Sequence, residues 1–205
     1  MHHTALPVLS TVLRWQGDST SIPGKGRAKM HRTTTTGALL AMLLVVAMPR
    51  GAVAQEPQAA GTFGDWTAYH YKTKKGPVCY IVSQPVKAEL SRKGAKRDPV
   101  FFLVTHRPGN KVRGEVSTII GYPFKPNSTP TVEIDGKRFL LFAVKDGAWS
   151  EGPQEDRKIV AAMKAGRTMV VRGVSKRGTT SVDTYSLKGV TAALNKIDEL
   201  CGYRK

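Results

Sequence analysis

Two cysteines, Cys79 and Cys201, are the whole cysteine content of this chain of 205 residues, and they constrain its fold most strongly. They lie 122 positions apart and form no Cys-x-x-Cys motif. In an oxidising compartment such a pair is expected to form a structural disulfide rather than to catalyse thiol exchange. Zinc is a weaker alternative, because residues 55–205 offer only His70 and His106 as further soft ligands. We therefore expect a Cys79–Cys201 disulfide, no metal site and no cofactor.

The N-terminal part of the sequence indicates export. Residues 37–48 form an apolar stretch that is too short to cross a bilayer comfortably, and Pro49, Arg50 and Gly51 follow it. The small-x-small pattern Ala52-Val53-Ala54 then suits a signal peptidase. We expect cleavage between Ala54 and Gln55 and a periplasmic or secreted protein. A retained membrane anchor is the weaker interpretation, since a lipoprotein would need a cysteine where Gln55 stands.

The position of the signal peptide also suggests where translation begins. Met30 would open a well-proportioned signal peptide over residues 30–54, with His31 and Arg32 as its charged head. Residues 1–29 are then interpreted as a mis-assigned N-terminal extension, and a long leader that starts at Met1 is the alternative. In both cases residues 55–205 are expected to form one domain of ordinary size.

The exported part is strongly basic. The chain has 32 Lys and Arg against 15 Asp and Glu; residues 1–54 hold six bases and one acid, which leaves 26 − 14 = +12. Such a field favours anionic partners. Nucleic acid is a poor candidate in the periplasm, and aromatic residues are not interleaved with the bases as single-strand binding requires. The expected partner is an anionic envelope component or an envelope or host protein, with possible peripheral membrane contact.

Two segments are candidates for a binding surface. Residues 88–98 lack apolar periodicity and are expected to form an exposed basic loop, with solubility as the alternative role of its charges. The segment Tyr122-Pro123-Phe124-Lys125 is rigid, and its aromatic rings could either fill the core or be exposed. The candidate surface comprises Arg92, Lys93, Lys96, Arg97, Tyr122, Phe124 and Lys125.

The pattern of apolar and turn residues predicts an all-β fold with two short helices. After a polar lead-in at 55–62 and with a turn at Gly76-Pro77, strands are expected at 63–69, 78–83, 99–105, 115–120, 131–134, 138–144, 168–174 and 179–187. Asp135-Gly136 is a hairpin signal. Helices are expected at 156–166 and 189–200. Closely spaced strands with few helices favour a β-sandwich, with the disulfide tying the C-terminal helix to the strand that carries Cys79.

The sequence offers little evidence for catalysis. It contains no nucleophile elbow, phosphate-binding glycine loop, zinc protease motif or calcium loop in the exported part. His106 could act as a base in an enzyme that acts on the cell wall, but a lone histidine at the end of a strand is more often structural. Glu155 and Asp156 are adjacent and fit a helix N-terminus better than an acid/base pair. No catalytic residues are assigned.

An ordered series of short motifs resembles one family. The motifs are Phe63-Gly64-Asp65-Trp66, Cys79-Tyr80-Ile81, Val104-Thr105-His106-Arg107-Pro108, Gly121-Tyr122-Pro123-Phe124-Lys125, Ile134-Asp135-Gly136-Lys137-Arg138-Phe139, Ala148-Trp149, Val160-Ala161-Ala162-Met163, Gly173-Val174-Ser175-Lys176-Arg177-Gly178-Thr179 and Asp183-Thr184-Tyr185-Ser186-Leu187. Together they are similar to the invasion-associated locus B family of alphaproteobacterial envelope proteins.

The resemblance implies an immunoglobulin-like β-sandwich, an envelope or secreted location and no recognised enzymatic activity. Some members are linked to the entry of bacteria into host cells, and many carry a further cysteine near the position of His70. We expect a non-enzymatic envelope binding module of this type, and the resemblance implies a contribution to host-cell interaction. The alternative is a periplasmic structural or accessory protein without a direct ligand.

Overall fold

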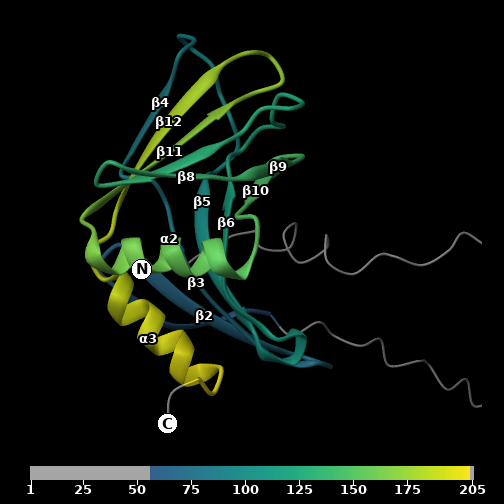
Figure 1. Ribbon diagram of the computed structural model, residues 1–205, viewed down its shortest axis with the longest axis vertical. Coiled ribbons are helices and arrows are strands. Elements are labelled where there is room, and N and C mark those ends of the chain that lie inside the picture. The colour runs from purple at the N-terminus through teal and green to yellow at the C-terminus, as the bar shows by residue number, and fades with distance from the viewer. Residues whose placement is uncertain (1–55, 204–205) are drawn as a thin grey trace, which may run out of the picture. The chain divides into compact units, whose positions relative to one another are not determined.

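The computed structural model describes residues 56–203 (Figure 1). The expected extension at 1–29, the signal peptide at 30–54 and the cleavage point between Ala54 and Gln55 lie outside the described residues. Within the described residues, no helix is long and apolar enough to span a membrane.

The larger of two sheets has seven antiparallel strands in the order β1-β2-β3-β5-β6-β10-β9. Its strands are β1 (Gln58–Phe63), β2 (Trp66–Thr73), β3 (Gly76–Ser83), β5 (Phe101–Arg107), β6 (Val112–Ile119), β9 (Phe142–Val144) and β10 (Gly147–Trp149). A short 3-10 turn, η1 (Pro108–Asn110), connects β5 to β6. This sheet carries Cys79 on its third strand.

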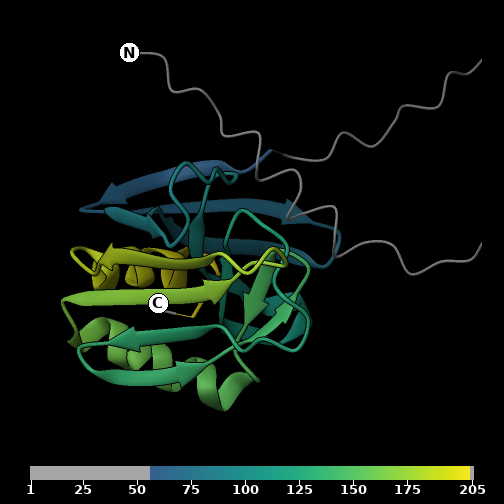
Figure 2. The same cartoon turned by 90° about the horizontal axis from the view of Figure 1, so that it is seen from above.

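The second sheet has five antiparallel strands in the order β4-β12-β11-β7-β8, which run side by side in Figure 2. Its strands are β4 (Lys87–Leu90), β7 (Thr131–Ile134), β8 (Lys137–Leu140), β11 (Thr168–Val174) and β12 (Thr180–Ser186). The chain passes repeatedly from one sheet to the other, so each sheet contains segments that are distant in sequence. β4, for example, pairs with β12.

Alternating side chains create the core between the sheets. Along β11, Met169 and Val171 are fully buried whereas Thr168 and Arg172 are exposed, as the two-residue period of a strand requires. The rings of Phe102 and Tyr185 meet across the two sheets with centroids 5.8 Å apart. Trp66 joins the sheets as well, since its indole N–H donates to the Ser186 carbonyl at 3.0 Å. Trp66 is therefore a core residue.

Two helices complete the core on the inner side of the seven-stranded sheet (Figure 1). α2 (Pro153–Ala165) packs on β6, and α3 (Val190–Leu200) packs on β1, β2 and β3. Gly189 begins α3 at φ +89°, where an added Cβ would lie 2.0 Å from the Phe63 carbonyl oxygen. Only glycine fits this close approach. Cys201 follows α3 directly and forms the disulfide with Cys79, with Cα atoms 6.1 Å apart.

The predicted fold class is confirmed: residues 56–203 form an all-β sandwich of two antiparallel sheets with two short helices, of which the C-terminal one is tied by the Cys79–Cys201 disulfide. The strands predicted at 168–174 and 179–187 and the helix predicted at 189–200 coincide with β11, β12 and α3 within one residue.

Four local predictions were wrong. The lead-in at 55–62 contains β1, and the turn assigned to Gly76-Pro77 occurs at Lys74 and Lys75. The loop at 88–98 begins with the edge strand β4. The strand predicted at 138–144 breaks at Leu141, whose N–H donates to the Pro130 carbonyl, so that β8 joins one sheet and β9 the other.

Candidate functional site

Three basic segments meet at one end of the five-stranded sheet. The loop after β4 lies beside the start of β12, because the Ser91 N–H donates to the Thr180 carbonyl and the Thr180 N–H to the Ser91 hydroxyl, both at 2.9 Å. This places the loop next to the turn between β11 and β12. Two bases of that turn, Lys176 and Arg177, thereby approach the bases of the loop.

The segment that leads to β7 lies against the same turn. Phe124 forms an isolated antiparallel bridge with Ser175, and the Lys125 N–H donates to the Val174 carbonyl at 2.9 Å. The Lys176 N–H donates back to the Pro123 carbonyl at 2.9 Å. Backbone hydrogen bonds therefore fix the position of Lys125 relative to Lys176.

We define the basic tip as the six exposed cations of these three segments. None of the ion pairs found within residues 56–203 includes one of their side chains. The members are Arg92, Lys93, Lys96, Lys125, Lys176 and Arg177. Their charges are not neutralised locally, so this end of the sheet presents a positive potential to solvent.

Arg97 does not belong to the exposed surface, contrary to the sequence-based expectation. Its side chain is 8% exposed and forms a two-point ion pair with Asp183 of β12, whose side chain is fully buried. The same guanidinium donates to the Ile120 carbonyl at 3.3 Å. Burial alone would lower the pKa of Arg97, but the bonded Asp183 carboxylate outweighs it and raises that pKa. Arg97 anchors the loop that carries Arg92, Lys93 and Lys96.

Tyr122 and Phe124 also serve as anchors. The Tyr122 hydroxyl lies 2.6 Å from the Ser181 hydroxyl of β12, and its ring meets Phe124 edge-on at 5.8 Å. Phe124 is 7% exposed and belongs to the core cluster. Of the candidate segment 122–125, the structure thus places Lys125 in the basic tip and the two aromatic side chains largely inside. The core-filling alternative holds for Phe124.

A pocket adjoins the basic tip at Lys125. Phe124 donates its N–H to the Lys145 carbonyl at 2.8 Å, and Leu141 donates its N–H to the Pro130 carbonyl at 2.9 Å, so the segment 124–130 is fixed at both ends of β9. Between these two bonds Asn127 has a left-handed φ of +59°. The pocket that this segment lines together with residues 140–143 has a volume of about 550 Å³.

Sequence reasoning missed part of this region. The bases Lys176 and Arg177 were visible as a cluster, but their proximity to Arg92 depends on the pairing of β4 with β12, which residue patterns do not reveal. Leu140 and Phe142 were assigned to one continuous strand. The run Leu140-Leu141-Phe142 interrupts the alternation of a strand, and this was the available signal for a change of sheet.

His106 lies apart from the basic tip. It is buried on β5, where it faces Asp198 of α3. Its Nδ1 accepts the Gly114 N–H at 2.9 Å, so the neutral ring carries its proton on Nε2, which lies 3.1 Å from Asp198 Oδ1. Arg113 donates to the same carboxylate oxygen at 3.1 Å, and the Tyr203 ring packs edge-on against His106. Since Asp198 belongs to α3 and His106 to β5, this cluster ties the helix to the sheet.

The stability of the protein should depend on pH through His106. Burial lowers the pKa of His106, and the Asp198 carboxylate opposes this only in part. The unfolded chain therefore binds the proton more readily than the folded protein. The free energy of unfolding should be unaffected by this group above about pH 6.5 and should fall below it, by at most about 1.4 kcal/mol per pH unit.

Urea denaturation between about pH 5 and pH 8 checks this expectation. His106→Gln should lower stability at all pH values but flatten the decline below about pH 6.5. Asp156, whose pKa is raised by burial although Ser150 and the Val116 N–H donate to it, is present in both proteins and cancels in the comparison. If the free energy of unfolding declined equally with falling pH in both proteins, His106 would not be the group responsible for the decline.

No metal centre accompanies these groups: within residues 56–203, no cluster of three or more His, Cys, Asp or Glu could hold a metal ion. Asp156 accepts hydrogen bonds from Val116 and Ser150, which fits a structural role at the start of α2.

The fold and site define a disulfide-locked β-sandwich with an unpaired basic tip beside a partly apolar pocket. The chain belongs to the invasion associated locus B (IalB) protein family, whose model matches residues 66–198. A search of curated proteins gave no significant match. Among solved structures, the chain is similar to invasion associated protein B from Bartonella henselae, with 14% identity and a TM-score of 0.48, covering 70% of this chain and 97% of that chain.

Proposed function

We propose that this protein is a non-enzymatic binding module of the bacterial envelope, exported to the periplasm or the cell surface, which binds an anionic partner through the basic tip. One observation carries the proposal: three segments from different parts of the chain bring together six cations that have no ion-pair partner among the described residues. Charges that served only solubility would not require this convergence.

The way in which the tip is held also supports a binding role. The buried Arg97–Asp183 ion pair attaches the loop after β4 to β12. The hydrogen bond between Tyr122 and Ser181 attaches the segment that carries Lys125 to the same strand. A surface that is held rigidly loses less conformational entropy on binding than a mobile loop does. Anionic glycans of host cells offer the same chemistry as anionic envelope components, so host contact is included in the proposal.

The test compares two triple variants in binding to heparin, a water-soluble polyanion. R92Q/K93Q/K96Q removes three charges from the tip. K72Q/K74Q/K75Q removes three exposed lysines at the β2–β3 hairpin, at the opposite end of the described fold in Figure 1. The oxidised protein should bind more weakly at about 200 mM salt than at about 50 mM, and the tip variant should lose at least about tenfold in affinity.

The control variant should lose much less, because the two variants have the same net charge. Equal losses in both would show that net charge alone drives binding and would contradict a defined site. Absence of salt-sensitive binding by the unmodified protein would favour an accessory protein that has no direct anionic ligand.

A further inference from the structure

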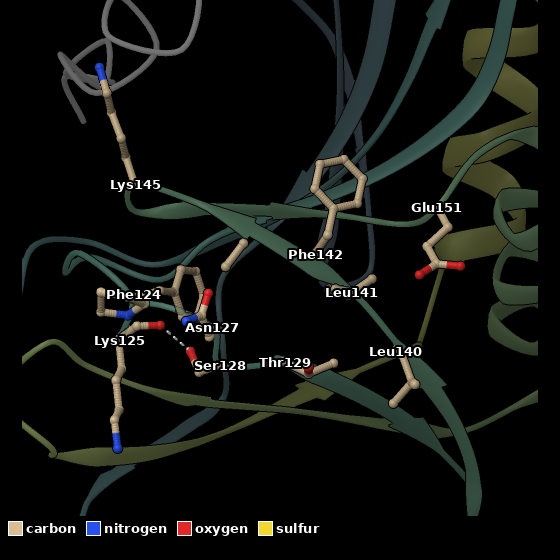
Figure 3. Close-up of a pocket in the computed structure, with 12 residues that line it drawn as sticks. Phe124, Lys125, Asn127, Ser128, Thr129, Leu140, Leu141, Phe142, Lys145 and Glu151 are labelled. Carbon is tan, nitrogen blue, oxygen red and sulfur yellow. Dashed lines mark hydrogen bonds between the residues drawn. The ribbon is translucent and has the colours of Figure 1, made fainter.

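The pocket beside Lys125 has an apolar wall that opens to solvent. Leu140 is 54% exposed and Phe142 is 47% exposed, and both line the pocket together with the buried Leu141 (Figure 3). Among the described residues, one other large apolar side chain is exposed to a similar degree, Val86 at 62%. Exposed apolar side chains gathered at a concave site commonly mark an interaction surface.

The surroundings of the pocket are asymmetric in charge. Lys125, a member of the basic tip, lies at one end, and Glu151 lies at the opposite end in the view of Figure 3. The other polar residues that line the pocket are the neutral Asn127, Ser128 and Thr129 and a second cation, Lys145. The apolar wall is therefore continuous with a surface of six unpaired cations on the Lys125 side. An occupant that matches both parts must carry an apolar chain and a negative head.

Other kinds of occupant fit less well. An added peptide strand would need a free sheet edge, but β9 has only three residues and the segment 124–130 is hydrogen-bonded at both of its ends. A second copy of the chain would bring another basic tip toward the first, and like charges at an interface oppose association. A pocket of about 550 Å³ is within the usual range for small ligands.

We propose that this site docks on an anionic lipid bilayer, with the pocket accepting part of an acyl chain and Leu140 and Phe142 entering the apolar layer while the basic tip contacts the headgroups. This inference rests on the proposed function, because it names the partner of the same basic tip. A single apolar contact gives weak membrane binding, and a basic patch beside it supplies the second contribution.

The experiment measures binding to vesicles of phosphatidylglycerol and phosphatidylcholine and to vesicles of phosphatidylcholine alone. The oxidised protein should bind the anionic vesicles and not the neutral ones. L140S/F142S should lose at least about tenfold in affinity for the anionic vesicles and keep its affinity for heparin. V86S, which removes an exposed apolar side chain from the other end of β4, should bind as the unmodified protein does.

A second measurement uses the unmodified chain and so does not depend on the folding of a variant. Trp149 stacks on Phe142 with ring centroids 6.1 Å apart, whereas Trp66 is fully buried. The third tryptophan, Trp15, is absent from protein that begins at Gln55, which is the form to use. Phosphatidylglycerol with brominated acyl chains should therefore quench tryptophan fluorescence, and Trp149→Phe should remove most of this quenching.

The possible outcomes separate the two proposals. Unchanged vesicle binding by L140S/F142S, or no quenching by brominated chains, would overturn the lipid inference while salt-sensitive heparin binding still supported the basic tip. Capture of a soluble acidic protein without any vesicle binding would also overturn it. Equal losses of heparin affinity in R92Q/K93Q/K96Q and K72Q/K74Q/K75Q would instead contradict the proposed function.

Discussion

Replacing Cys79 and Cys201 together with alanine is expected to lower the free energy of unfolding by about 4 kcal/mol, one of the two largest effects expected for this protein. The disulfide closes a loop of 122 residues, and opening a loop of this length increases the entropy of the unfolded chain. It also attaches α3 to the inner face of β3, where Cys79 is fully buried. Because small domains have only about 5–15 kcal/mol of stability, the loss would be a large fraction of the total.

Urea denaturation of three samples checks this value: the oxidised protein, the reduced protein and C79A/C201A. The reduced protein and the double variant should have similar midpoints, both well below that of the oxidised protein. Hydrogen exchange should also become faster in α3 before it does in β11 or β12, which the disulfide does not touch. A loss of less than about 1 kcal/mol would show that the core and the His106–Asp198 contact hold α3 without the disulfide.

The second large effect is expected at Arg97. Arg97→Met removes the guanidinium and leaves the Asp183 carboxylate buried without its partner, which should cost about 3–5 kcal/mol of stability. R97M/D183N should recover part of this loss, because no buried charge is then left unpaired. The exposed Arg92, five positions earlier in the same loop, provides the control, and R92M should change stability by at most about 0.5 kcal/mol.

Thermal and urea denaturation of the four proteins measure these differences. If R97M were as stable as R92M, the ion pair with Asp183 would make no net contribution to folding. R97M should also weaken heparin binding, although the side chain is not exposed, because the loop carrying Arg92, Lys93 and Lys96 would lose its attachment to β12.

The parts of the fold that could be predicted are those in which each segment carries its own pattern. The apolar run Met169 to Val171 identifies β11, the turn at Lys176-Arg177-Gly178 separates it from β12, and the apolar stripe of Val190, Leu194 and Ile197 identifies α3. The disulfide could be predicted because the chain has a single pair of cysteines and its sequence predicts export.

The missed strands lack such a pattern. β1 and β4 are edge strands held mainly by backbone hydrogen bonds to one neighbour, so Ala59, Gly61 or Lys87 can occupy them without an apolar alternation. The burial of Arg97 could not be predicted for a related reason: its partner Asp183 is 86 positions away, and only the pairing of β4 with β12 brings them together. The pocket likewise depends on the backbone hydrogen bonds that place the segment 124–130 beside β9.

The edges of the two sheets have a consequence for the protein at high concentration. An open sheet edge can pair with another chain and start aggregation, and each of the edges here carries a feature that hinders it. β1 has a bulge between Ala59 and Gly61, and β9 is only three residues long. β4 and β8 have four residues each and carry lysines, Lys87 and Lys137. These features should hinder strand exchange between neighbouring molecules when the protein is concentrated.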